Sequence, residues 1–209
     1  MKMRSLLIVL LLAATILTGG KAEAQDKRFG VKGGLNLSNL SLEDNDDSNL
    51  RTGFHFGVWG AFPIATNLSV QPELQYSSDG TRWLQETSEY SADASLKLDY
   101  IELPVSLVYN LARDVDFHLG PYVAFLANAS SEATLKTGSS TLNLISDLDK
   151  DNFKSTDFGM QAGMRFHLNP IYIGFGYKLG LTEVAQDNAR NYFGDAANRS
   201  IRLSVGYTF

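Results

Sequence analysis

The sequence contains no cysteine among its 209 residues. This absence excludes disulfide bonds, a cysteine nucleophile, thiolate metal sites and lipid attachment to an amino-terminal cysteine. An excess of basic residues is also lacking, because the 18 Lys and Arg are outnumbered by 23 Asp and Glu. The resulting formal charge of −5 argues against broad nucleic-acid binding, which requires a basic face.

No apolar run is long enough for a membrane-spanning helix, which needs about 20 residues. The run Leu6–Leu17 has only 12 residues and follows Lys2 and Arg4. Ala22-Glu23-Ala24 comes shortly after it, which completes the pattern of a secretory signal peptide. We expect cleavage after Ala24, so that residues 25–209 form one mature domain; an uncleaved anchor is the alternative.

Familiar catalytic motifs are missing as well. The chain has no G-x-S-x-G, no phosphate-binding P-loop and no H-E-x-x-H. We therefore expect no enzyme activity, no catalytic residues, no cofactor and no metal site.

What the sequence does contain is strict alternation, seen most clearly in the last ten residues. One face carries Ile201, Leu203, Val205, Tyr207 and Phe209, and the other carries Ser200, Arg202, Ser204, Gly206 and Thr208. This period of two predicts a β-strand with one apolar and one polar face. An exposed apolar strand at the end of a chain invites aggregation unless it pairs with another strand and closes a barrel.

Eight such runs follow one another along the mature chain. They are Phe29–Leu37, Gly53–Phe62, Leu68–Ser78, Leu96–Leu111, Val115–Leu126, Asp157–Leu168, Ile171–Leu181 and Ser200–Phe209. The connections alternate: polar loops at 38–52, 79–95, 127–155 and 182–198 are long, and the others are short turns. Short periplasmic turns and long external loops are typical of outer-membrane barrels.

These patterns predict an all-β fold: an eight-stranded antiparallel transmembrane β-barrel with up-and-down meander order. Both termini should lie on the periplasmic side of the outer membrane of a Gram-negative bacterium. A soluble lipocalin-like barrel with inverted faces is the alternative fold. Pro72, Pro104 and Pro121 fit poorly inside strands, so we expect bulges or strand ends there.

The mature chain also resembles the PorT-like outer-membrane β-barrel family. The matching segments are Phe29–Leu37, Gln71–Tyr76, Tyr100–Pro104, Gly120–Tyr122 and Val205–Phe209. The resemblance implies an eight-stranded barrel in the outer membrane and provides no catalytic residues. The ending resembles a terminal-aromatic signal, which implies recognition of the carboxyl-terminal strand and Phe209 by the barrel assembly machinery.

Charged residues on the inner faces are the main candidate site. We expect a lumen charge network that comprises Glu73, Glu102, Lys32, Arg165, Lys178 and Arg202. An eight-stranded barrel is just wide enough for side chains to fill, and buried charges need partners. The network is therefore expected to plug the lumen, and a gated narrow channel is the alternative.

Three other groups are weaker candidates. His118 and His167 with Asp116 could bind zinc, but a hydrogen-bonded lumen lining is the preferred interpretation. The acidic stretch Glu43–Asp47 does not follow the EF-hand pattern and is expected to be solvated. A lipid-acting enzyme would need His55 to meet a serine, with Ser38, Ser41 and Ser48 as the candidates in the preceding loop.

The expected role is structural or interaction-based, with the long external loops binding a protein or surface ligand. The expected partners are therefore outer-membrane lipid, the assembly machinery and such a ligand, without nucleic acid. A narrow porin-like pore is the first alternative function and the lipid-acting enzyme the second.

Overall fold

The computed structural model describes residues 27–41, 50–86, 90–137, 140–148, 153–184 and 197–209. Nine strands run through these residues. They are β1 (Arg28–Ser41), β2 (Arg51–Ala65), β3 (Leu68–Glu86), β4 (Tyr90–Ala112), β5 (Val115–Thr137), β6 (Ser140–Asp147), β7 (Thr156–His167), β8 (Ile171–Glu183) and β9 (Ala197–Thr208). Within these ranges no helix is long and apolar enough to cross a membrane.

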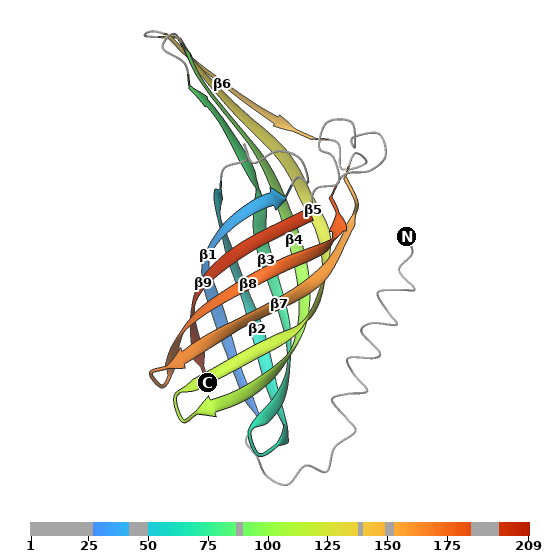
Figure 1. Cartoon of the computed structure of the whole chain (residues 1–209), viewed down its shortest axis with the longest axis vertical. Coiled ribbons are helices and arrows are strands. Elements are labelled where there is room, and N and C mark those ends of the chain that lie inside the picture. Colours follow the sequence, from blue (N-terminus) through green and yellow to red (C-terminus); the bar gives the residue numbers. More distant parts are fainter. Residues whose placement is uncertain (1–26, 42–49, 87–89, 138–139, 149–152, 185–196) are drawn as a thin grey trace.

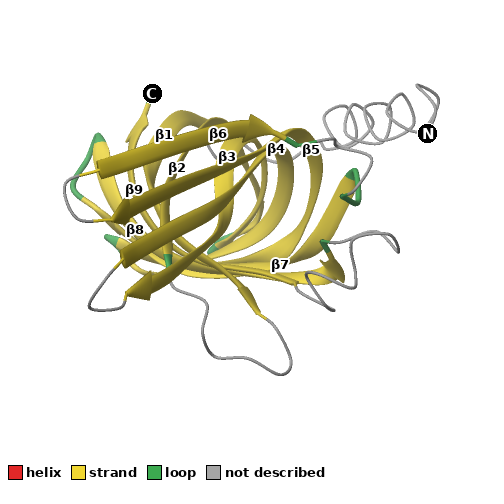
Figure 2. Ribbon diagram, turned by 90° about the horizontal axis from the view of Figure 1, so that it is seen from above, coloured by secondary structure: helices red, strands yellow, loops and turns green. Residues whose placement is uncertain are grey.

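Eight of the strands close into one ring, in which every neighbouring pair is antiparallel (Figures 1 and 2). The seam is formed by β1 and β9, which pair from Gly30 with Thr208 to Ser41 with Ala197. The remaining strand, β6, pairs with β5 beyond the point where β7 leaves it. The predicted eight-stranded antiparallel meander is confirmed, and β6 is an addition to it.

The two ends of the barrel differ. One rim carries the short turns at 66–67, 113–114 and 168–170, together with the start of β1 and the end of β9 (Figure 1). The amide of Phe209 donates to the carbonyl of Phe29 at 2.9 Å, which ties the two ends of the ring together. The opposite rim carries the long connections.

A sheet protrudes from this second rim (Figure 1). It consists of the far halves of β3, β4 and β5, joined by β6. The prediction of long polar loops at 79–95 and 127–155 was therefore wrong, because most of these residues belong to strands. These residues extend beyond the closed ring, where the strands no longer separate a lumen from the outer surface, so the apolar alternation that marks the wall is weak there.

The wall separates an apolar surface from a polar interior. Large apolar side chains such as Leu35, Phe56, Phe175 and Leu203 are exposed on the outside. The side chains that alternate with them are mostly polar, charged or glycine and are buried in the lumen. This is the face assignment of a barrel surrounded by lipid, because a soluble barrel would reverse it.

The three prolines do not end strands or shift the register. The β3–β4 ladder skips from Pro72–Val105 to Gln75–Glu102, and the β4–β5 ladder skips from Pro104–Tyr122 to Leu107–Leu119. Pro121 pairs with Met160 in an unbroken ladder. On its other side each proline falls in a gap of the ladder: Pro72 lies opposite Gly60, Pro104 opposite Glu73 and Pro121 opposite Val105, and none of these pairs forms. The expectation of bulges or strand ends was nevertheless wrong, because the register is the same on both sides of each gap.

Candidate functional site in the barrel lumen

The middle of the lumen holds two cations between two carboxylates. Lys178 on β8 contacts Asp79 at 2.6 Å and also forms an ion pair with Glu102. Arg202 on β9 donates through Nη2 to both oxygens of Glu102, at 3.0 and 2.9 Å. Gln75 donates a further hydrogen bond to Glu102. The four charged groups therefore balance one another in a layer that is closed to solvent.

Two aromatic rings lie inside the lumen, on the side of this layer that faces the long connections. The ammonium of Lys178 lies 4.9 Å from the ring centroid of Tyr122 and 5.6 Å from that of Tyr100. Cations are attracted to the faces of such rings, most strongly where water is excluded. Tyr122 and Asn198 both donate to Asp157, at 3.1 and 3.0 Å, so a polar layer continues above the ions.

A second charged layer lies nearer the short-turn rim. Lys32 pairs with Glu73, which also accepts from Gln71 at 2.7 Å. Arg165 donates to Asp116 at 2.8 Å and to Gln71 at 2.9 Å. His167 contacts the other oxygen of Asp116 at 2.6 Å. The guanidinium of Arg165 also lies 5.6 Å from the Trp59 ring and 5.3 Å from the Tyr172 ring, as part of an apolar floor.

All six charged residues singled out from the sequence lie on the inner face, but they are divided between the two layers. Glu102, Lys178 and Arg202 meet in the middle, whereas Glu73 pairs with Lys32 and not with them. Asp79, which was assigned to a loop from the sequence, was not among the predicted lumen charges, and neither was Asp116, which was considered only beside His118 and His167.

The described residues contain no cluster of three His, Asp or Glu side chains suited to a metal ion. Asp116 is occupied by Arg165 and His167, so its oxygens already have partners. The acidic stretch Glu43–Asp47 and the predicted signal peptide, residues 1–24, lie outside the described residues.

His55 meets a serine that the sequence did not indicate. Its Nε2 lies 2.9 Å from Oγ of Ser204 on β9, and its Nδ1 lies 2.7 Å from Oδ1 of Asn36. The Asn36 amide nitrogen donates to Ser77 Oγ at 2.9 Å, which turns its oxygen towards His55. Ser38, one of the predicted serines, instead donates to the carbonyl of Arg51. Ser41 is the last residue of β1, and Ser48 lies outside the described residues.

Apolar side chains fill the lumen above the ions. A buried cluster at the long-loop end includes Leu40, Leu98, Tyr100, Phe153 and Val184. Phe153 enters it because its neighbour Lys154 donates its amide to the carbonyl of Val184 at 2.9 Å. At the other end, Trp59, Ala61 and Tyr172 form a smaller buried group.

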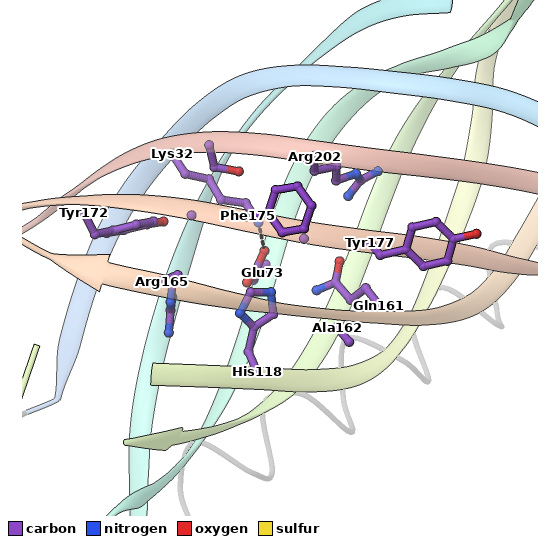
Figure 3. Close-up of a pocket in the computed structure, with 13 residues that line it drawn as sticks. Lys32, Glu73, His118, Gln161, Ala162, Arg165, Tyr172, Phe175, Tyr177 and Arg202 are labelled. Atoms are coloured by element: carbon purple, nitrogen blue, oxygen red, sulfur yellow. Dashed lines mark hydrogen bonds and ion pairs between the residues drawn. The ribbon is translucent and has the colours of Figure 1, made fainter. Parts of the chain in front are cut away.

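Between these groups lies a cavity of about 30 Å³. Figure 3 shows Arg202, Arg165 and His118 arranged around the Lys32–Glu73 pair in this region. Ser204 also lines the cavity. A water molecule needs roughly 10–15 Å³ of such space, so the cavity is too small for an organic substrate.

Comparison with known proteins identifies the family of this chain. Residues 23–186 match the family model described as "Outer membrane protein beta-barrel domain". No curated protein matches the chain. Among solved structures, the attachment invasion locus protein Ail of Yersinia pestis is 14% identical with a TM-score of 0.46, and the match covers 88% of this chain and 100% of Ail.

Two other solved structures are similar. Neisserial surface protein A is 15% identical with a TM-score of 0.48, covering 90% of this chain and 100% of that protein. A major outer membrane protein of Thermus thermophilus is 11% identical with a TM-score of 0.45, covering 88% and 100%. Because the family model spans most of the sequence, this chain belongs to the outer membrane protein beta-barrel domain family and is a protein of the Gram-negative outer membrane.

Proposed function

We propose that this protein is a closed outer-membrane barrel that presents its protruding sheet to a protein partner at the cell surface. The observation that carries the proposal is the edge of β6. Among the described residues β6 pairs only with β5, so its other edge meets no described strand. An unpaired edge offers a row of backbone N–H and C=O groups to an added strand.

The exposed side chains of β6 support this role. Leu142 and Leu144 are 54% and 58% exposed, and both lie on one face of a strand outside the barrel wall. Apolar side chains held next to an open edge are suited to an extended peptide, which pairs through its backbone and packs alternate side chains. The partner is therefore a protein segment in extended conformation.

The proposal includes a membrane orientation. The short-turn rim with both ends of the ring would face the periplasm, and the protruding sheet would face outward, as in other outer-membrane barrels. A signal peptide cleaved after Ala24 would deliver the chain to the periplasm. The narrower likeness to the PorT-like barrels is consistent with this arrangement and remains part of the proposal.

Two features argue against the alternative functions. A pore would need a continuous aqueous path, whereas the lumen side chains form buried ion pairs beneath a buried apolar cluster. An acyl-transfer enzyme would need substrate access to Ser204, but its partner His55 is buried and the cavity beside it holds about 30 Å³. Both features favour a barrel that serves as an anchor.

Site-specific photo-crosslinking in cells tests the proposal. A photoreactive amino acid at Leu144 should yield a discrete protein adduct, and the variant Leu142→Thr should weaken it because part of the apolar surface is lost. The same probe at Leu203, which is exposed on the barrel wall, is the control and should react only with lipid. Adducts with lipid alone at both positions would disprove the protein-binding role.

A further inference from the structure

The lumen cavity has an unusual balance of charge. Three cations, Lys32, Arg165 and Arg202, line it together with one carboxylate, Glu73. The carboxylates that pair with Arg165 and Arg202 belong to Asp116 and Glu102, and neither of these lines the cavity. The side chains that line the cavity therefore include more cations than carboxylates, and charges interact more strongly in such a buried site than in water.

Arg202 has donors to spare at this place. Its side chain is buried, with 6% of the residue exposed, and only Nη2 is used for the bonds to Glu102 and Ser77. Its Nε and Nη1 have no hydrogen-bond partner. His118, which also lines the cavity, has an unpartnered buried Nδ1. Buried donors without an acceptor are costly, and a guanidinium can donate but never accept.

Two glycines keep the space open. A Cβ atom built on Gly174 would come no closer than 3.4 Å to another heavy atom, with Arg165 and Ser204 as its nearest neighbours. Gly176 lines the same cavity and faces the same side of β8. These small residues lie near three cations and leave a space that larger side chains would fill.

We propose that this cavity binds a small inorganic anion, of the size of a halide. A monovalent anion can accept hydrogen bonds from the unpartnered Nε and Nη1 of Arg202, and charge-assisted hydrogen bonds of this kind are stronger than those to a neutral water. The volume of about 30 Å³ excludes larger organic acids. The anion completes the packing of the charged layers, and this inference goes beyond the proposed surface role and does not depend on it.

Crystals of the barrel, folded from urea in sodium bromide, test the proposal directly. Folding in bromide exposes the lining residues to the anion before the barrel closes around them. We expect an anomalous bromide peak within hydrogen-bond distance of the Arg202 guanidinium. No peak among the lining residues would overturn the proposal.

A pair of glycine variants provides the solution test. Gly174→Ala reduces the cavity and keeps every charge, whereas Gly33→Ala adds the same methyl group on the outer face, where its nearest neighbour is 3.6 Å away. For the wild type and Gly33→Ala, the unfolding temperature should rise saturably with bromide, relative to gluconate at equal ionic strength. The Gly174→Ala variant should need at least tenfold more bromide. An equal rise in all three proteins would show only a general salt effect and overturn the site.

Discussion

Lys178 illustrates what a charge requires inside this barrel. It is 0% exposed, and taking an ammonium out of water costs several kcal/mol even after the protein relaxes. Two carboxylates and two aromatic rings replace the lost water around it. A buried ammonium is tolerated only when its counter-charges are all present, so the stability of the layer depends on each of Asp79, Glu102, Lys178 and Arg202.

Arg202→Ala tests this dependence. The substitution leaves Lys178 as the one cation between Asp79 and Glu102, so an uncompensated carboxylate remains buried. We expect a loss of about 3–5 kcal/mol in the free energy of unfolding, measured by urea titration in detergent.

The matched control for this variant is Arg82→Ala. Arg82 also forms an ion pair, with Asp93, but both side chains are partly exposed on the protruding sheet. Exposed pairs contribute at most about 1 kcal/mol, so this variant should unfold close to the wild type. Equal losses in the two variants would contradict the buried-network argument.

At the scale of the strand, the sequence predicted the segments that form the closed ring and missed the segments that extend beyond it. The wall strands were recognised because lipid on one side and a polar lumen on the other enforce strict alternation. The far halves of β3 and β5 lacked this constraint, and β6 was hidden in a polar segment. The same reasoning explains the site: alternation indicated that Lys178 and Arg202 face inward, but Asp79 meets them only because the closed ring places β3 across the lumen from β8 and β9.

The last strand carries a prediction of its own. Phe209 is 76% exposed, and the hydrogen bond that anchors it uses its backbone amide, so Phe209→Ala removes little packing. We expect the stability in detergent to change by about 0.5 kcal/mol or less. If the assembly machinery recognises the terminal aromatic residue, the amount of folded protein in the outer membrane should fall severalfold, as measured by fractionation.

Phe166→Ala is the control for this variant. Phe166 is also an exposed aromatic residue and lies near the same rim, next to the end of β7, but it is not at the chain terminus. The variant should assemble like the wild type. If both substitutions reduce assembly equally, the cause is the loss of an aromatic residue from the membrane face and not the loss of a terminal signal.

The whole molecule combines a closed cylinder with an open sheet. In the ring every strand has two neighbours, which removes unpaired edges from the lipid. Beyond the rim the described part of β6 has one neighbour only. In the proposed role the lumen holds the cylinder together, and the partner binds to the sheet that protrudes from the rim. This division explains why the lumen can be filled with bonded side chains without loss of the proposed role.

Planar-bilayer conductance tests this division. Ions would have to cross the apolar cluster around Leu98 and Phe153 and then separate the pairs of Lys178 with Asp79 and Glu102. Apolar constrictions exclude water, and breaking buried ion pairs is costly, so the two barriers act in series. We expect the reconstituted barrel to give the baseline current of protein-free lipid, with a porin reconstituted in parallel to show that channels are detected. Unitary steps that grow with salt concentration, and disappear when the sample is boiled first, would contradict this prediction. They would also mean that the charged layers open in the membrane, so that the lumen and not the protruding sheet would carry the function.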